Sequence, residues 1–259
     1  MSFAKDLLAS QHIVISGGAG ALGAAIVKGL TSHGARVTVN DIVDGRTAMS
    51  RLEQAGVDSA CFRYVRADLT GSGEADRLIA EARSGFGPIQ TALCHAGIVI
   101  AKPLLDISRT DWERTMDVNL KAAFLLGKAA ARTMIEDGNG GHLIFTTSWV
   151  SETPWPEIGP YNASKAGMNQ LMRSFARELA PKVRANAIAP GIVGAGMAKR
   201  QWDTDPSYRA RAQRAIPLGI MQPLESVADA FLFLCSPAAS YMTGSVLVID
   251  GGCSLYPMD

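Results

Sequence analysis

The sequence has few cysteines, almost no net charge and no long apolar run. None of its four cysteines stands in a CxxC or Cys/His spacing typical of metal sites. A formal net charge of +1 argues against nucleic acid or an anionic membrane surface as a partner. No apolar run approaches the roughly 20 residues of a transmembrane helix, and the N-terminus lacks the features of a secretory signal. These absences predict a cytoplasmic chain with reduced thiols and no metal site.

Short apolar runs alternate with helix-length segments along all 259 residues. The runs cover residues 12–16, 36–41, 61–68, 89–97, 141–148, 183–190 and 246–252. Most are apolar throughout, which is typical of parallel strands covered on both faces. No linker or repeat divides the chain. The pattern predicts an α/β fold, a single doubly wound Rossmann-type domain over residues 1–259 with a seven-stranded parallel sheet flanked by helices.

The longest departure from this alternation is residues 191–222, which follow the sixth predicted strand. We expect a mobile substrate lid there, at the carboxyl edge where such sheets bind ligands. Its basic residues either attract an acidic substrate or form a solvated helix face; they are Lys199, Arg200, Arg209, Arg211 and Arg214. Three tryptophans either touch substrate or pack the lid or a subunit interface; they are Trp149, Trp155 and Trp202.

The stretch "ISGGAGALGAAI" follows the first predicted strand and opens the first helix. Gly18, Gly20 and Gly23 match the dinucleotide fingerprint G-x-G-x-x-G, while Gly17, Ala21 and Gly23 match a looser G-x-x-x-A-x-G spacing. Glycines let the backbone approach a pyrophosphate, and the helix N-terminus offers free N–H groups. The loop predicts a dinucleotide site.

Asp41 ends the second predicted strand, 18 residues after Gly23. A carboxylate there accepts bonds from both ribose hydroxyls and repels a 2′-phosphate. Neither Gly20 nor Ile42 supplies a positive charge for such a phosphate. The sequence therefore favours NAD over NADP, and the alternative is that Asp41 merely caps a turn.

The stretch "TTSWVSETPWPEIGPYNASKAG" holds the candidate catalytic residues. Tyr161 and Lys165 stand four residues apart at the start of a predicted helix, so they share one face. A lysine ammonium near the phenol is expected to lower the pKa of Tyr161, which could then exchange a proton with an alcohol or ketone. Ser148 ends the fifth predicted strand and could bond the reacting oxygen. Asn119, a poor helix former inside a predicted helix, suggests a polar role such as holding a water.

Taken together, these motifs resemble the classical short-chain dehydrogenases/reductases over essentially the whole chain. The glycine motif of that family falls on Ser16, Gly17, Ala21 and Gly23, so the looser spacing is the one that the resemblance supports. The serine, Y-x-x-x-K and catalytic asparagine motifs fall on Ser148, Tyr161–Lys165 and Asn119. Further matches are Asp68, Pro190–Gly191 and the closing Thr243, Gly244, Asp250, Gly251 and Gly252.

The resemblance implies a role for each matching residue. Tyr161 would be the general acid/base and Lys165 would lower its pKa and bond the nicotinamide ribose. Ser148 would orient the substrate oxygen, and Asn119 would hold a water in a proton relay. The implied NAD-binding residues are Gly17, Gly20, Ala21, Leu22, Gly23, Asp41, Ile42, Asp68, Leu69, Ala96, Gly97, Tyr161, Lys165, Pro190, Gly191, Ile192 and Val193.

Three places depart from the family pattern. Ala195 stands where the family often has a threonine, and Ile220 replaces a common arginine. "CHAG", Cys94 to Gly97, replaces the N-N-A-G of the family, and we interpret His95 as a structural substitute in preference to a catalytic histidine. The other histidines, His12, His33 and His142, are expected at the surface or at strand edges, without metal spacing.

The preferred hypothesis is an NAD-dependent dehydrogenase that transfers hydride between the cofactor and a secondary alcohol or ketone. The "DGGCSLYPMD" tail favours a polyol, sugar or related hydroxy compound, and the family resemblance implies a homotetramer. One alternative is a 3-oxoacyl-thioester reductase, although such enzymes usually prefer NADPH, which Asp41 opposes. The other is a non-catalytic NAD-sensing protein on the same fold.

Overall fold

The computed structural model describes residues 3–255. The strands are β1 (His12–Ser16), β2 (Arg36–Asp41), β3 (Phe62–Arg66), β4 (Thr91–Cys94), β5 (Gly141–Thr146), β6 (Val183–Pro190) and β7 (Val246–Ile249). The helices are α1 (Ala21–Ser32), α2 (Gly45–Gln54), α3 (Glu74–Phe86), α4 (Arg109–Met116), α5 (Ala122–Glu136), α6 (Gly159–Leu179), α7 (Gly196–Thr204), α8 (Pro206–Ala215) and α9 (Leu224–Cys235). No helix in this described part is long and apolar enough to cross a bilayer.

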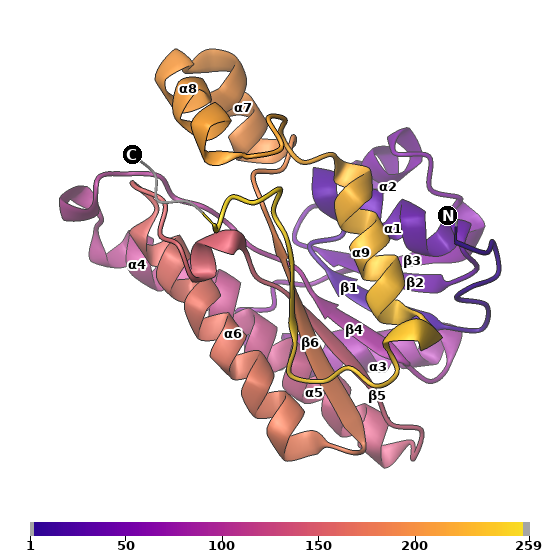
Figure 1. The fold of residues 1–259 in the computed structure, drawn as a ribbon. Helices are drawn as coiled ribbons and strands as arrows, with labels where there is room; N and C mark the ends of the chain where they lie inside the picture. The colour runs from indigo at the N-terminus through magenta and orange to yellow at the C-terminus, as the bar shows by residue number, and fades with distance from the viewer. Residues whose placement is uncertain (1–2, 256–259) are drawn as a thin grey trace.

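Within the described residues, seven parallel strands form one sheet in the order β3-β2-β1-β4-β5-β6-β7 (Figure 1). The direction of the strand order reverses between β1 and β4, and ligands of such sheets bind at that reversal, beyond the carboxyl ends of the strands. The predicted fold class is confirmed. The predicted strands are all present, and most of their observed bounds are shorter by one to five residues.

Helices cover both faces of the sheet. Side chains of α1, α2 and α9 pack in the core on one face, whereas those of α3, α5 and α6 pack in the core on the other. Successive residues of β1 illustrate this, because Ile13 and Ile15 belong to the first core and Val14 to the second. Burial on both faces explains why the strand sequences are apolar without alternation.

The same two-sided burial corrects the expectation for two histidines. His12 and His142 are only 3% exposed, inside β1 and β5. The His12 ring bonds Thr38 Oγ1 at 2.9 Å, and the His142 ring bonds the Asn186 amide at 2.8 Å. Burial lowers the pKa of His142 to about 3. These rings are neutral, hydrogen-bonded parts of the sheet and not surface groups.

The long helical segment predicted before β5 is interrupted near its middle. A π-helical turn, Asp117–Lys121, joins α4 to α5 and contains the fully buried Asn119. A capping box of Ser108 and Asp111 fixes the start of α4. Such π-turns widen the helix locally and are frequent at functional sites.

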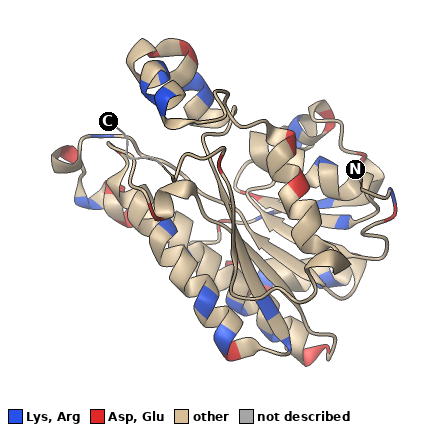
Figure 2. Cartoon of the chain, viewed as in Figure 1, with Lys and Arg blue, Asp and Glu red and all other residues tan. Residues whose placement is uncertain are grey.

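Residues 191–222 leave the sheet after β6 and form α7 and α8, the uppermost part of the molecule in Figure 1. A bridge between Val193 and Gln222 closes the base of this excursion. Lys and Arg residues occur along this excursion (blue in Figure 2), and Lys199 pairs with Asp203 on α7. The last four residues of the C-terminal tail lie outside the described residues.

Candidate active site

The glycine loop connects β1 to α1 at the reversal of strand order. A Cβ atom at Gly17 would lie 2.8 Å from the Ala96 Cα, and Gly17 has a φ of +71°. At Gly23 a Cβ would lie 2.7 Å from the Gly18 Cα and closer still to the Gly17 carbonyl oxygen. At Gly20 it would meet only that oxygen, at 3.4 Å. At Gly18 a Cβ would lie 2.7 Å from Val39 Cγ1. The close packing therefore requires Gly17, Gly18 and Gly23 but not Gly20, and the need for Gly17 and not Gly20 favours the looser spacing.

Ser16 connects this loop to the loop after β4. Its hydroxyl accepts hydrogen bonds from the backbone N–H groups of His95 and Ala96, at 3.0 and 3.1 Å. These bonds hold the two loops on either side of the reversal at a fixed separation. The loops thereby form two walls of one cleft.

Asp41 lies at the end of β2, and its carboxylate is held against the glycine loop. One carboxylate oxygen accepts from the Ala19 N–H at 3.2 Å, and the other accepts from the Ile42 N–H at 2.8 Å. Asp68 follows β3 and accepts from the Thr70 N–H and hydroxyl. The Thr70 bonds lower the pKa of Asp68 below its ordinary value. Both carboxylates stand beyond the carboxyl ends of their strands.

A cavity of about 760 Å³ extends from these residues to α6. Its lining includes most of the predicted cofactor residues, namely Gly17, Gly20, Ala21, Leu22, Gly23, Asp41, Ile42, Asp68, Leu69, Ala96, Gly97, Tyr161, Lys165 and Val193. Among the described residues, the predicted Asn119, Ser148, Pro190, Gly191 and Ile192 are not part of that lining. The lining suits a dinucleotide, because the glycine loop leads into a helix N-terminus and the Asp41 carboxylate lies beside that loop in the same cavity.

Tyr161 and Lys165 both line the cavity from the first turns of α6. The Lys165 ammonium lies 5.4 Å from the centre of the Tyr161 ring and donates to the Thr146 carbonyl at 2.7 Å. Ser148 lies just beyond β5, only 6% exposed, and its hydroxyl caps the turn that follows. Helical spacing and the end of β5 therefore bring these residues to one end of the cavity.

The sequence predicts that Lys165 lowers the pKa of Tyr161, and this prediction is wrong for the side chains of the protein alone. Burial raises the pKa of Tyr161 to about 12, although the Ser148 hydroxyl acts in the opposite direction. Burial also lowers the pKa of Lys165 to about 8. Burial is the largest cause for both groups, and the Lys165 ammonium is not among the causes of the shift at Tyr161. The phenol is consequently protonated at neutral pH.

Asn119 is fully buried, and its amide connects two elements of the site. Its side-chain oxygen accepts from the Ile98 N–H at 2.8 Å, and its amide nitrogen donates to the Ile98 carbonyl at 3.0 Å. The same nitrogen lies 3.1 Å from the Ser164 hydroxyl on α6. The Asn119 side chain thus fixes the loop after β4 against the helix that carries Tyr161.

His95 occupies a structural position in the cavity wall. Its ring bonds the Thr146 hydroxyl at 3.0 Å, and its edge faces Phe231. Burial, followed by the nearby Lys165 ammonium, lowers the pKa of His95 to about 4, so the ring is neutral. Cys94 lies behind it and donates to the Ala123 carbonyl at 3.4 Å. These contacts agree with the interpretation of His95 as a structural substitute.

The aromatic residues of the loop after β5 and of α8 pack against one another. Trp149 and Trp155 meet edge to face at 5.5 Å, and Trp155 contacts Tyr208 of α8 in the same way at 5.9 Å. Arg211 lies over the Trp155 ring, 5.2 Å from its centre. Trp149 and Trp155 are only 4% and 6% exposed, so they connect the loop after β5 to the lid.

Two residues that support the site, Asn40 and Gln222, belong to none of the motifs. Asn40 precedes Asp41 and donates to the carbonyls of Val65 and Ala67. Gln222 fixes the start of the lid, because its side chain accepts from the Gly191 N–H at 2.8 Å. An asparagine inside an apolar strand was a usable signal for Asn40. Nothing local to Gln222 indicates its long-range contact.

The doubly wound fold, the glycine loop and the Tyr161–Lys165 pair are together typical of an oxidoreductase that uses a nucleotide cofactor. Comparisons with known proteins identify its family. A family model described as enoyl-(acyl carrier protein) reductase matches residues 17–254. The chain is 34% identical over 256 residues to 3beta-hydroxysteroid dehydrogenase 1 of Eggerthella lenta, with 97% of each protein covered. It is 28% identical over 253 residues to glucose 1-dehydrogenase of Gluconobacter oxydans, covering 97% of the chain and 95% of the relative.

A solved structure agrees with these relatives. A short-chain type dehydrogenase/reductase from Mycobacterium marinum has a TM-score of 0.89 and 30% identity, with 97% of this chain and 99% of that chain covered. The protein therefore belongs to the classical short-chain dehydrogenase/reductase family. It is an oxidoreductase of a family whose dehydrogenases act on alcohols and use nicotinamide cofactors.

Proposed function

We propose that this protein is an NAD-dependent dehydrogenase that interconverts a secondary alcohol and the corresponding ketone. The observation that carries the proposal is the single cavity that Asp41 lines together with Tyr161 and Lys165. The names of the relatives specify a hydroxysteroid and glucose. We therefore propose a hydroxyl on a ring, in a sugar, polyol or related hydroxy compound, as the reacting group.

The proposed chemistry divides between cofactor and protein. A bound nicotinamide ring supplies or accepts the hydride. The Tyr161 phenol, protonated at neutral pH, donates its proton to the ketone oxygen during reduction, and its phenolate form accepts the proton of the alcohol during oxidation. Ser148 orients that oxygen, and Lys165 stabilises the phenolate that remains after proton donation. Asn119 keeps α6 in place through Ser164 and supports the water of the proposed relay.

Selection of NAD rests on the Asp41 carboxylate. It lines the cavity, and two backbone N–H groups hold its oxygens beside the glycine loop. A ribose with two free hydroxyls can donate to it, whereas a 2′-phosphate would bring a second negative charge to the same place. A 3-oxoacyl-thioester reductase has the same catalytic residues, and this carboxylate is our reason for ranking it second.

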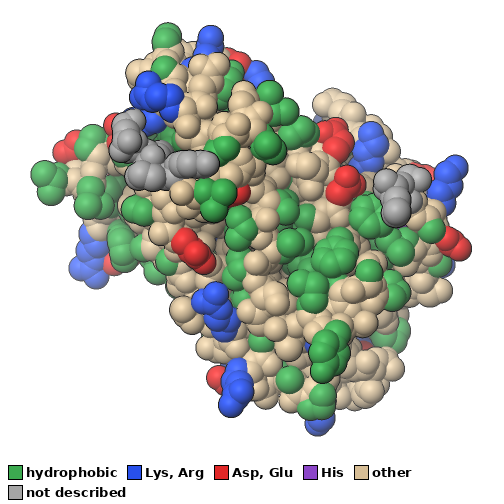
Figure 3. Space-filling view, viewed as in Figure 1, with side chains coloured by type: hydrophobic (Ala, Val, Ile, Leu, Met, Phe, Trp, Pro, Cys, Tyr) green, Lys and Arg blue, Asp and Glu red, His purple; other side chains and the backbone are tan. Residues whose placement is uncertain are grey.

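A homotetramer remains part of the proposal, as does a cytoplasmic location. β7 is an edge strand on which Val248 is 46% exposed, and Tyr241 before it is fully exposed. Hydrophobic side chains also gather on the face of the molecule in Figure 3. Burial of these groups against another subunit would remove apolar surface from water.

Absorbance of the reduced nicotinamide tests the proposal. Purified protein is offered NAD with sugars, polyols, cyclic secondary alcohols, hydroxysteroids and hydroxyacyl thioesters. We expect turnover with one class of ring or polyol hydroxyl. Tyr161→Phe should lower kcat by about 10²–10⁴-fold, the usual contribution of general acid/base catalysis, and leave NADH binding nearly intact. Turnover of hydroxyacyl thioesters alone would favour the reductase, and wild-type turnover in the variant would refute the role of Tyr161.

A further inference from the structure

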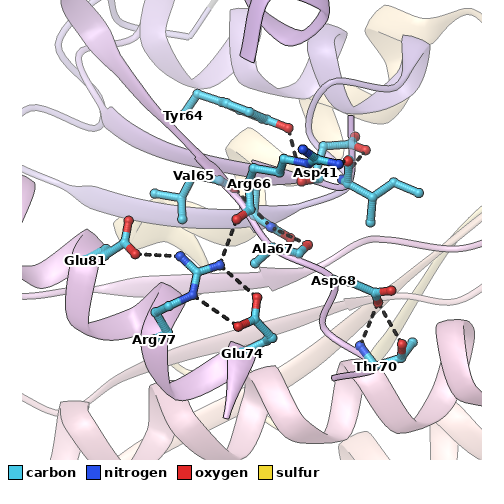
Figure 4. Close-up of polar contacts among 12 residues, drawn as sticks. Asp41, Tyr64, Val65, Arg66, Ala67, Asp68, Thr70, Glu74, Arg77 and Glu81 are labelled. Atoms are coloured by element: carbon cyan, nitrogen blue, oxygen red, sulfur yellow. Dashed lines mark hydrogen bonds and ion pairs between the residues drawn. The ribbon is translucent and has the colours of Figure 1, made fainter. Parts of the chain in front are cut away.

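The turn that carries Asp41 is fixed from the neighbouring strand β3. The β2–β3 ladder ends where Asp41 pairs with Arg66, so the carbonyls of Ile42 and Val43 lie beyond it. Two β3 side chains bond the carbonyls of this turn (Figure 4). We call Tyr64 and Arg66 together the β3 clamp.

The clamp bonds three consecutive carbonyl groups. The Tyr64 hydroxyl lies 3.0 Å from the Asp41 carbonyl oxygen and 2.5 Å from that of Val43, so its one proton is shared between them. The Arg66 Nε donates to the Ile42 carbonyl between these two, at 3.0 Å. In Figure 4 both side chains approach the same turn, Tyr64 with its hydroxyl foremost.

This arrangement orients the carboxylate through one peptide group. The Asp41 carbonyl and the Ile42 N–H belong to the same planar trans peptide, so their directions are opposite and coupled. Tyr64 holds the carbonyl end, and the N–H end donates to the Asp41 carboxylate at 2.8 Å. Fixing the carbonyl therefore fixes the N–H group that positions the carboxylate.

From this geometry we propose that the β3 clamp is a specificity-determining device, and that Tyr64 and Arg66 are positioning residues for the choice between NAD and NADP. The inference rests on the proposed use of NAD. With the clamp in place, the carboxylate stays where it accepts from a ribose and repels a 2′-phosphate. Without it, the carboxylate can turn away, which weakens binding of NAD and relieves the repulsion of NADP.

The nearby arginines allow the clamp to be distinguished from a direct effect of positive charge on NADP binding. Neither Arg51 nor Arg66 lines the cavity, although both lie close enough to affect the Tyr64 phenol. Arg51 approaches the Ala19 carbonyl at 3.5 Å. If Arg66 acted only through charge, its removal would make NADP binding weaker. If Arg66 instead acts as part of the clamp, its removal should weaken the preference for NAD over NADP.

The test measures kcat, and KM for NAD and NADP, in the wild type and in Tyr64→Phe, which keeps the ring and the net charge. One hydrogen bond contributes about two- to tenfold in an equilibrium. We expect the KM(NADP)/KM(NAD) ratio to fall by about three- to tenfold, with kcat for NAD unchanged. Tyr241→Phe, which removes an exposed hydroxyl, is the matched control and should keep the wild-type ratio.

Two further variants separate the outcomes. In an Asp41→Ala background, Tyr64→Phe should no longer change the ratio, because the carboxylate that it positions is gone. Arg66→Met should also lower the KM(NADP)/KM(NAD) ratio, which keeps the proposal testable if Tyr64→Phe fails to fold. A higher ratio in Arg66→Met would mean that Arg66 acts through its charge and would overturn the proposal. An unchanged ratio in Tyr64→Phe, or an equal change in both backgrounds, would overturn the proposal. A wild type without preference for NAD would instead overturn the proposed cofactor itself.

Discussion

Replacing two glycines of one loop by alanine should have unequal consequences for stability. At Gly23 a Cβ would overlap the backbone of Gly17 and Gly18, which cannot rotate away. Such overpacking costs up to about 3 kcal/mol, and the greater helix propensity of alanine offsets about 1 kcal/mol. Gly23→Ala should therefore lose about 2 kcal/mol, which lowers Tm by about 4–8 °C in a domain of this size.

Gly20→Ala is the matched control in this comparison. Gly20 has φ −74° and ψ 164°, a conformation that alanine adopts without strain, and a Cβ there would have an ordinary contact. Loss of the favourable glycine N-cap costs only a few tenths of a kcal/mol to about 1 kcal/mol. Thermal unfolding of both variants, followed by circular dichroism, makes the comparison. Equal loss in both would refute the assignment of the looser glycine spacing, whereas a Gly23→Ala variant as stable as the wild type would refute the close packing at Gly23.

Three further predictions concern the cofactor and pH. Asp41→Ala should raise the Kd of NADH by about tenfold, the effect of about 1.4 kcal/mol, and leave the Kd of NADPH equal or lower. Fluorescence titration measures both constants. An unchanged ratio of the two Kd values would contradict the ribose contact. Because burial raises the pKa of Tyr161 to about 12, the rate of alcohol oxidation should increase from pH 7 to 10 while the rate of ketone reduction stays level. Initial rates in both directions test this prediction. An oxidation rate that falls over this range would contradict it. Burial lowers the pKa of His142 to about 3 and of His95 to about 4, so the unfolded chain binds more protons below pH 6.5 and the free energy of unfolding should fall as the pH drops from 6.5 toward 4. Urea unfolding at pH 7 and pH 5 measures the change, which should be smaller in His142→Gln.

The parts of the fold and site that depend on local spacing could be predicted from the sequence. Strand–helix alternation predicts the parallel sheet, and helical periodicity places Tyr161 and Lys165 on one face of α6. The glycine spacing follows from close approach of backbone segments, which no other residue permits at Gly17 and Gly23. Each of these features leaves a pattern in the spacing of residues along the chain.

The remaining features depend on contacts between distant segments. Tyr64 acts on carbonyls 21 and 23 residues away, and a tyrosine in a strand gives no sign of such partners. His142 was expected at the surface or at a strand edge, but a sheet covered on both faces buries it and the Asn186 amide bonds its Nε2 atom. The pKa of Tyr161 depends on how much water the folded cleft excludes, which spacing alone does not give.

The most direct test of the account is the ratio of kcat/KM for NAD to kcat/KM for NADP, measured on the secondary alcohol that the wild type oxidises fastest. The account predicts a clear preference for NAD, lost in Asp41→Ala, together with loss of turnover in Tyr161→Phe. Equal or greater efficiency with NADP would contradict the role of Asp41. NADH binding without turnover on any alcohol would contradict a dehydrogenase acting through Tyr161.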